Sequence, residues 1–516
     1  MEQVSKNLKK YIISIFSIVV FLLFVFAAIN YKGQLYIYLF FSLLSNFCLL
    51  FAFRKNALFF DTFINCLLWL GFWLKLTIRL IFFDGLYNEP VGNFDHSGAA
   101  YDEVLIVICI GLIGFLCASL LREKWLFNYP AKIPFNQASG LYRFYSRYRN
   151  RILISFILII LLISISNIFL GIYQRGLIPT VVPAFGIDGL YKWLLLFGFA
   201  SISSIIIMNE LVKFNRLTSV AIIIGIFETF FSNVSLLSRG MIINAGALCY
   251  GIYKSHLSGK FTTGIRIVTI GISLLIIFFI CSVYISNYLR IKNLNESIYS
   301  LLPNNVNQNY GIFEIKDREY KKNEINKIKH NKKSKKKFSE YLKSNTNIFM
   351  KLFIDRWVGM ETMMAVSSYP DKGWSLWTDA WAEKFQYNQM TFYDRQFVSS
   401  QYVKTDFIKH HNISVPGILA FFYYPGSKLF LLFTMFCLGL FAAGIEIIVF
   451  RFCNANMVLC SLFSMVIAYR FAHFGYAPAQ SYLLFGALTF NIFLIYLLDI
   501  LLSRYMWNKN EELRSG

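Results

Sequence analysis

The sequence contains few charged residues for a chain of 516 residues. Only 15% of the residues are Asp, Glu, Lys or Arg, whereas soluble domains contain about 25%. Apolar residues make up 57% of the chain and aromatic residues 18%, and 54 Phe with 31 Tyr cannot all be placed in one water-soluble core. This composition excludes a cytosolic enzyme and a disordered chain.

Disulfide, metal and nucleotide motifs are also missing from the sequence. The nine cysteines lie in or beside apolar segments, no two are spaced as CxxC, and no Cys/His cluster has the spacing of zinc ligands. A secreted disulfide scaffold is therefore excluded, and we expect no metal site. The pattern GxxxxGK(S/T) and a soluble dinucleotide-binding unit are absent as well, so no cofactor is expected.

What the sequence does contain is a series of apolar runs, most of them close to the length of a membrane-spanning helix. We therefore predict an all-α polytopic membrane protein with about twelve transmembrane helices. The predicted spans are residues 11–29, 35–53, 62–82, 103–121, 152–172, 193–208, 217–233, 241–253, 265–287, 427–450, 456–470 and 481–502. No small-residue cleavage site follows the first run, so we interpret it as a retained span rather than a signal peptide.

Lys and Arg residues are distributed unevenly between the predicted loops. If the N-terminus is inside, most of the basic residues of the short loops fall on the inner side. The short outer loops hold only Lys32, Arg175, Lys192, Arg239 and Arg470. Because cytoplasmic loops carry an excess of Lys and Arg, both termini are predicted to be cytoplasmic.

The predicted spans divide the chain into three regions. Residues 1–287 form a nine-span region with basic cytoplasmic loops, 288–426 form one long extracytoplasmic loop, and 427–516 hold the last three spans and a cytoplasmic tail. Residues 316–343 of the loop are Lys-rich, and we expect a solvated, partly disordered tether there. Contact with an anionic glycan or lipid headgroup is the alternative explanation of this charge. We expect no nucleic-acid binding on the extracytoplasmic side.

Charged residues inside predicted spans are the first functional candidates, because a charge in a bilayer costs roughly 2.5 to 3.5 kcal/mol on insertion scales. Lys75 and Arg79 lie four residues apart on one face of the third span. They predict a polyanion or pyrophosphate site, and snorkelling to the interface is the alternative. Glu228 in the seventh span is predicted to be a partner of one of these cations, with a proton-carrying role as the alternative.

The long loop contains further candidates in an apolar, helical stretch. Arg356 and Glu361 interrupt this stretch, and Glu361 is either a general base or the ion-pair partner of a basic neighbour. Trp374, Trp377 and Trp381 share one helix face, which is typical of an interface belt or core and also suits stacking on sugar rings.

The end of the long loop combines histidines with two Pro-Gly pairs. His410 and His411 precede the pairs that begin at Pro416 and Pro425. A histidine at this position could accept a hydroxyl proton near neutral pH. The two Pro-Gly pairs indicate a short re-entrant or interfacial segment before the tenth span.

Six cations from separate segments are predicted to face the same outer boundary, and His473 lies close to the last of them. They are Lys75, Arg79, Arg175, Arg239, Arg356 and Arg470. Arginine binds phosphate through a bidentate fork. A site with many fixed cations and few carboxylates suits a diphosphate better than a metal ion.

Three sequence segments, together with the span count and the long late outer loop, carry a family resemblance. The segments are SLLSRGMI, DRWVGMETMMAV and SVPGILAFFYYPGSKLF. They resemble the Wzy-type O-antigen or oligosaccharide-repeat-unit polymerases of bacterial surface polysaccharide pathways. Arg175 and Gly186 also fit the Arg-x10-Gly pattern of some members, although the long loop has no second copy of it.

The resemblance implies a GT-C-like fold and a metal-independent glycosyltransferase in the bacterial inner membrane. Its substrates would be an undecaprenyl-diphosphate-linked donor and acceptor, and its other partners would be membrane lipids and a chain-length regulator. In this scheme Arg239 and Arg356 hold the diphosphate, and Glu361 and His411 compete as the base. The substrate-binding residues would be Lys75, Arg79, Arg175, Arg470, His473, Trp374 and Trp377.

Three alternatives remain at this point. An O-antigen ligase would use the same donor, and the run from His410 to Asn412 is compatible with it. A lipid-linked-glycan flippase or transporter is disfavoured, because we find no internal repeat of the kind common in transporters. A membrane scaffold would have all its charges paired internally.

Overall fold

The computed structural model describes residues 2–87, 89–238, 242–257, 265–300, 357–386, 390–398 and 414–515, and within these ranges it is helical with no strand. The helices before the long loop are α1 (Glu2–Asn30), α2 (Leu35–Ala52), α3 (Phe59–Leu68), η1 (Trp69–Leu74), α4 (Lys75–Phe82), α5 (Gly98–Leu121), η2 (Arg122–Leu126), α6 (Gly140–Leu170), α7 (Ile187–Trp193), η3 (Leu194–Gly198), α8 (Phe199–Phe214), α9 (Ser219–Ser235), α10 (Ile242–Leu257) and α11 (Ile265–Ser300). Those that follow are α14 (Met360–Ser367), α15 (Trp374–Trp381), η4 (Asp394–Val398), α16 (Gly417–Phe422), α17 (Lys428–Phe452), α18 (Met457–Ala472), η6 (Pro478–Gln480) and α19 (Ser481–Ser515).

The prediction of an all-α polytopic membrane protein is confirmed in its coarse form. Eight helical segments among the described residues are long and apolar enough to cross a membrane, and three shorter apolar helices accompany them. Each of the twelve predicted spans overlaps a helix, but α10 belongs to neither group. The number of spans and their orientation therefore stay predictions.

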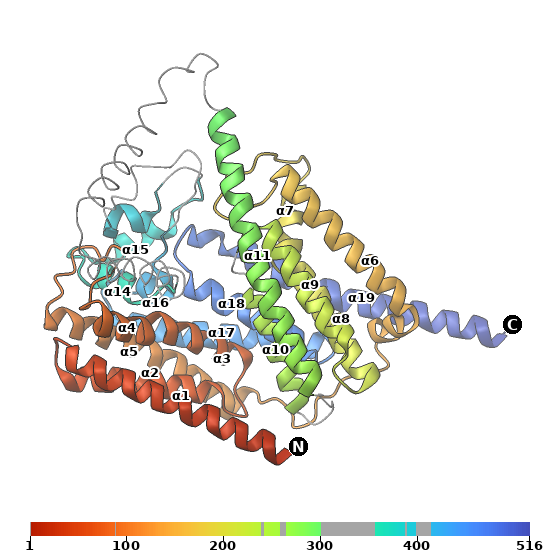
Figure 1. Ribbon diagram of the computed structural model, residues 1–516, viewed down its shortest axis with the longest axis horizontal. Coiled ribbons are helices and arrows are strands. Elements are labelled where there is room, and N and C mark those ends of the chain that lie inside the picture. The colour runs from red at the N-terminus through yellow and green to blue at the C-terminus, as the bar shows by residue number, and fades with distance from the viewer. Residues whose placement is uncertain are drawn as a thin grey trace, which may run out of the picture. The chain divides into compact units, whose positions relative to one another are not determined.

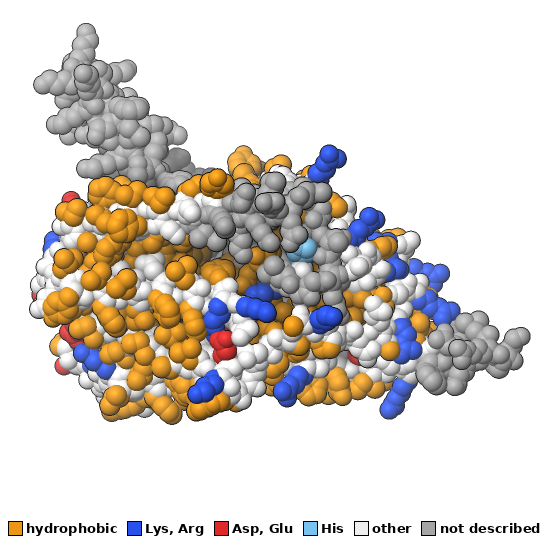
Figure 2. All heavy atoms as spheres, turned by 90° about the horizontal axis from the view of Figure 1, so that it is seen from below, with side chains coloured by type: hydrophobic (Ala, Val, Ile, Leu, Met, Phe, Trp, Pro, Cys, Tyr) orange, Lys and Arg blue, Asp and Glu red, His pale blue; other side chains and the backbone are white. Residues whose placement is uncertain are grey.

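Large apolar side chains cover much of the surface of the helices. On α1 and α2, Phe21 and Leu43 each expose 62% of their area. Figure 2 shows side chains of this kind covering a broad part of one face. A soluble monomer rarely exposes so large an apolar surface, so this face is suited to lipid.

The chain divides into two compact units, residues 1–286 with 358–516, and residues 287–357. The predicted loop 288–426 is thus split, because its second part belongs to the unit that contains most of the long apolar helices. The candidate residues that the structure describes all lie in this unit.

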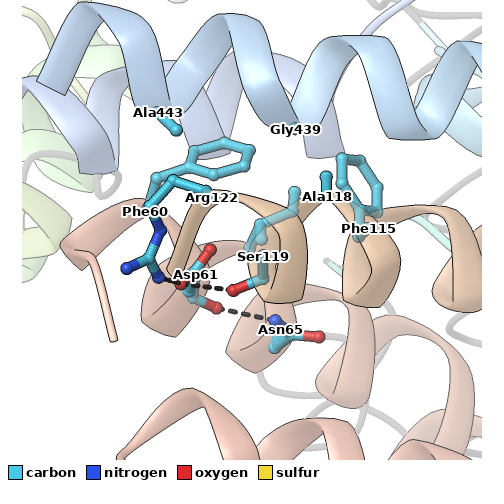
Figure 3. Close-up of a pocket in the computed structure, with 10 residues that line it drawn as sticks. Phe60, Asp61, Asn65, Phe115, Ala118, Ser119, Arg122, Gly439 and Ala443 are labelled. Carbon is cyan, nitrogen blue, oxygen red and sulfur yellow. Dashed lines mark hydrogen bonds and ion pairs between the residues drawn. The ribbon is translucent and has the colours of Figure 1, made fainter. Parts of the chain in front are cut away.

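The third predicted span is one helix built from α3, the π-helical turn η1 and α4. Two carboxylates stabilise its first turn, one from α17 and one from the helix itself. Glu446 of α17 accepts the backbone N–H groups of Phe59 and Phe60, both at 2.9 Å. Asp61 accepts hydrogen bonds from Arg122 Nη2 at 2.7 Å and Ser119 Oγ at 2.6 Å, as Figure 3 shows. Because α5 and α17 hold the first turn, this end of the helix that carries Lys75 and Arg79 is fixed in position.

Two short buried helices, α14 and α16, pack among the longer ones. All eight residues of α14 are buried, and so are all six of α16. Helix α14 packs against α5 and α16, and α16 packs against α17 and α18; Figure 1 shows the two short helices next to each other. Helix α16 lies between Pro416 and Pro425. That this segment is re-entrant or interfacial stays a prediction.

Close backbone contacts hold α14 in this position. A Cβ atom at Gly71 would lie 2.3 Å from the carbonyl oxygen of Val358, and one at Gly359 would lie 2.3 Å from the carbonyl oxygen of Gly71. Gly417 has a φ of +78°, and its Cβ would lie 3.0 Å from the carbonyl oxygen of Ala472. Glycine is therefore required where η1, α14, α16 and α18 meet.

We predict that Gly71→Ala destabilises the protein by about 1 to 3 kcal/mol, because the added methyl group overlaps the carbonyl of Val358. The matched control is Gly444→Ala in α17, where a Cβ would meet no atom within 4 Å. The control should be neutral or slightly stabilising, since alanine favours a helix. The thermal unfolding midpoints of the detergent-purified variants compare the two, and equal midpoints would contradict the close approach.

Candidate functional site

A buried ion cluster joins the third helix to α14. Lys75 Nζ lies 2.8 Å from Glu361 Oε2, and the two side chains are 0% and 7% exposed. Glu89 Oε2 lies 3.9 Å from Lys75 Nζ and 4.0 Å from Arg79 Nη2. The two cations that share one face of α4 are thus each matched by a carboxylate. Neither cation reaches solvent, so snorkelling does not describe them.

The loop after α4 folds back and encloses Arg79. The Arg79 carbonyl accepts the backbone N–H of Gly85 at 2.9 Å, and Arg79 Nη1 donates to the Leu86 carbonyl at 3.2 Å. The guanidinium lies 4.9 Å from the ring centroid of Phe83 and 5.5 Å from that of Tyr87. Burial raises the pKa of the Tyr87 hydroxyl well above its usual value, so this wall of the site is neutral. The same loop brings Glu89 to the two cations.

Glu361 forms an ion pair with Lys75, as the alternative to a general base predicted. Its role as a proton acceptor stays a prediction. Glu228 does not pair with Lys75 or Arg79, so the favoured prediction for it is wrong. Its carboxylate instead accepts a hydrogen bond from Ser232 Oγ at 2.9 Å within α9, and it forms no ion pair with any described residue. Helix α9 packs against α6, α8 and α10, which places it away from α4.

A second group of basic residues surrounds the end of α18. Arg470 Nη2 donates to Ser481 Oγ at 2.9 Å, and its guanidinium lies 5.5 Å from the ring centroid of Phe474. Its Nε atom is buried without a hydrogen-bond partner. Across the described ranges no Asp or Glu forms an ion pair with Arg470. This is a largely buried charge with only neutral protein partners.

His473 lies beside this arginine in its neutral form. Its ring stacks on Tyr469 with a centroid distance of 4.1 Å, and Nδ1 is 3.1 Å from the Tyr469 carbonyl oxygen. Since a carbonyl only accepts, the proton of the neutral ring is assigned to Nδ1. Burial, together with the charges of Arg175 and Arg470, lowers the pKa of His473 to about 4. The charges of Arg175 and Arg470 therefore both act on His473.

Arg175 reaches this group from the loop between α6 and α7. Its backbone N–H donates to the carbonyl of Leu236, the residue that follows α9, at 3.0 Å. Gly186, at the other end of the predicted Arg-x10-Gly spacing, has a φ of +70° and immediately precedes α7. The spacing thus spans a loop that is fixed at both ends.

The two groups border the same backbone junction. Val358 touches η1 through its carbonyl, and its Cγ1 would lie 3.1 Å from a Cβ at Gly417, next to the carbonyl of Ala472. Glu361 follows Val358 by three residues, and His473 follows Ala472 directly. The backbone contacts at Val358, Gly417 and Ala472 thus link the third helix, α14 and α18, which carry the candidate side chains.

The three tryptophans lie on helix α15, as their spacing predicted. Trp374 is 54% exposed, whereas Trp377 packs against Phe422 and Phe430 with centroid distances of 6.2 and 5.3 Å. Trp381 packs against Phe421 at 5.4 Å. The indole Nε1 atoms of Trp377 and Trp381 are buried without a hydrogen-bond partner. The face is therefore partly aromatic core, and Trp374 is its exposed ring. Stacking on a sugar stays a prediction.

Three of the predicted catalytic residues, Arg239, Arg356 and His411, lie outside the described residues. Sequence reasoning missed Glu89 and Ser481, which contact the predicted cations. The only signal for Glu89 was an acidic residue before Pro90 in the loop after a charged span. Within the part of the chain that the structure describes, no group of three His, Cys, Asp or Glu side chains could hold a metal ion.

The chain was compared with known proteins. No family model matches the sequence, and no curated protein or solved structure matches it either. The class that the fold and the site define is therefore a polytopic helical membrane protein with a buried, mainly cationic site.

We predict that Lys75→Met lowers the unfolding free energy by about 3 to 5 kcal/mol, because it leaves the Glu361 carboxylate buried without its partner. The double variant Lys75→Met/Glu361→Leu should recover most of this loss. Lys192→Met is the matched control, since the pair with Asp188 is 39% and 31% exposed and such pairs contribute about 0 to 1 kcal/mol. Thermal and denaturant unfolding measure all four proteins. A loss in the double variant as large as that in Lys75→Met would contradict the pairing of the two residues.

We also predict that His473 makes the protein less stable in mild acid. Its pKa is about 4 in the folded protein and about 6.5 in an unfolded chain. The unfolded state therefore binds the proton first, and stability falls as the pH drops from about 6.5 towards 4. His473→Gln should remove this part of the pH dependence. Thermal unfolding midpoints of both proteins at pH 7.5 and pH 5 measure it. An unchanged difference between these two midpoints would rule out a buried neutral His473.

Proposed function

We propose that this chain is a Wzy-type polymerase of a bacterial surface polysaccharide. It would join undecaprenyl-diphosphate-linked oligosaccharide repeat units at the outer face of the inner membrane and release undecaprenyl diphosphate. The twelve-span count, the GT-C-like fold, the cytoplasmic termini and a chain-length regulator as partner belong to this proposal.

The observation that carries the proposal is the unmatched charge of Arg470. A buried ion costs several kcal/mol unless an opposite charge compensates it. The side-chain and backbone groups that Arg470 contacts are neutral, and the nearby charge on Arg175 has the same sign. A ligand with several negative charges fits this position. A lipid diphosphate combines that charge with an apolar tail suited to the exposed helices.

The proposed reaction is a single glycosyl transfer. A hydroxyl of the acceptor repeat unit attacks the anomeric carbon of the donor, and the bond between this carbon and the diphosphate oxygen breaks. The hydroxyl proton passes to a base, and the diphosphate leaves with the bonding electron pair. Arg470 and Arg175 would stabilise the charge on the leaving diphosphate.

Glu361 is the described residue that could accept the proton. Its carboxylate lies at the junction, held by Lys75 at 2.8 Å. A positioned carboxylate is a suitable general base. His411 remains the second candidate for this role. Trp374, with its exposed ring, would contact a sugar of the acceptor or donor.

The test is the length distribution of surface polysaccharide in the native host. Arg470→Ala and Arg470→Lys should each reduce long chains by about 10²- to 10³-fold, because a lysine lacks the bidentate fork. A single repeat unit should remain attached at the surface. Arg451→Ala, at an exposed residue in the last turn of α17, is the matched control and should leave the pattern unchanged.

Other outcomes distinguish the alternatives. An O-antigen ligase would leave no repeat unit attached, and a flippase would leave units trapped on the inner leaflet. A scaffold would lose protein abundance rather than product length. Normal long chains at wild-type abundance in Arg470→Ala would remove this arginine from the site.

A further inference from the structure

An open pocket lies between the loop that follows α15 and the loop that follows α18. Its volume is about 240 Å³. Three segments of the chain line it, and they contribute Ala382, Glu383, Lys384 and Gln386, then Met390 and Arg395, and finally Tyr476. Pockets for drug-sized ligands measure about 300 to 1,000 Å³. This pocket is therefore suited to a smaller ligand, on the scale of one sugar ring.

Hydrogen bonds between the lining segments hold the pocket in shape. Tyr476 Oη donates to the carbonyl of Gln386 at 3.1 Å and accepts the backbone N–H of Gln386 at 3.3 Å. The Glu383 carboxylate accepts the backbone N–H groups of Phe392 and Ala477, the latter at 3.3 Å. Because these bonds join all three segments, the pocket is formed before a ligand binds.

The lining carries more positive than negative charge. Lys384 and Arg395 face Glu383 alone, and both oxygens of this carboxylate already accept backbone N–H groups. Burial raises the pKa of the Glu383 carboxyl group, and the charge of Arg395 opposes this rise. Within the residues that the structure describes, Lys384 forms no ion pair, and both cations are exposed to solvent. A small anion that enters the pocket therefore meets an ammonium group without a carboxylate partner.

Tyr476 connects this pocket to Arg470. Its carbonyl oxygen lies 3.5 Å from Arg470 Nη2, and its ring packs against Phe385 with a centroid distance of 5.5 Å. Helix α15, which carries the exposed ring of Trp374, ends at Trp381, directly before the first lining residue. A pocket for a small polar anion thus adjoins the arginine to which we assign the diphosphate.

We propose that this pocket binds an acidic sugar of the lipid-linked repeat unit, a hexuronate or a sugar with an equivalent carboxylate. Lys384 and Arg395 bind the carboxylate, and the side-chain amide of Gln386 offers donors and an acceptor to the ring hydroxyls. This inference rests on the proposed function for the identity of the substrate. It adds that the polymer made by this protein contains an acidic sugar.

The pocket is tested with methyl glucuronide and methyl glucoside, two glycosides that differ only at C6, where one carries a carboxylate and the other a neutral hydroxymethyl group. Calorimetric titration of the purified full-length protein in detergent measures both affinities. The glucuronide should bind about fivefold more tightly, as expected for two exposed charge pairs. Lys384→Gln should reduce this preference to about twofold, and Lys384→Glu should abolish it. Salt at 1 M should also weaken the preference, because it screens exposed charges.

The matched control is Lys428→Gln, at an exposed lysine in the first turn of α17 that does not line the pocket. It should bind both glycosides like wild type, and the thermal midpoint verifies that each variant is folded. Equal affinities of wild type for the two glycosides, or an equal loss in Lys428→Gln, overturn the proposal. Inorganic pyrophosphate is the third probe. If it binds more tightly than the glucuronide and depends on Lys384, the pocket is a diphosphate site and the sugar assignment is wrong.

The binding readout separates this inference from the proposed function. If Arg470→Ala abolishes long polysaccharide but wild type does not distinguish the two glycosides, the polymerase stands and the acidic-sugar pocket is wrong. If the glucuronide preference depends on Lys384 while Arg470→Ala makes normal polymer, the pocket stands as an acidic-sugar site and the assignment of Arg470 to the polymerase site is wrong.

Discussion

The contact between Lys75 and Glu361 is the interaction on which the candidate site depends. It joins a residue of an early membrane helix to a short helix that follows the long loop, at 2.8 Å and with almost no exposure to solvent. Two buried ions lose most of their hydration, and only close pairing makes up for that loss. Gly71 and Gly359 let the two backbones approach closely, and this approach brings the two charged side chains together. The ion pair therefore depends on the backbone packing.

Charges elsewhere in the described chain are matched differently from those at this junction. Asp61 is met by Arg122, Arg54 and Ser119, and Glu446 accepts hydrogen bonds from two backbone N–H groups, Ser464 and Tyr129. In each case the ion is satisfied by the protein itself, which is what stabilising a fold requires. Arg470 lacks such a set of partners. This contrast within one molecule is why we propose a ligand for Arg470, whereas Asp61 and Glu446 stabilise the fold.

The sequence allowed the helices to be predicted because hydrophobic length and helical periodicity are local properties. It placed Lys75 and Arg79 on one helix face, and the structure has this feature. The contacts between distant segments could not be predicted in this way. Glu228 is the clearest case, since periodicity places it on a helix face but does not say which helix that face meets. Glu89 was missed for the same reason, because its importance comes from the loop folding back over Arg79.

The protonation state of His473 helps to separate binding groups from proton acceptors at the junction. A base that takes a hydroxyl proton works best when its pKa is near the working pH. Burial and two neighbouring arginines hold the pKa of His473 at about 4, which makes it a weak base at neutral pH. A neutral imidazole adds no charge of its own, so the arginines determine the local potential. In the proposed reaction His473 would therefore be a neutral substrate contact, and the proton would pass to another group, such as the carboxylate of Glu361.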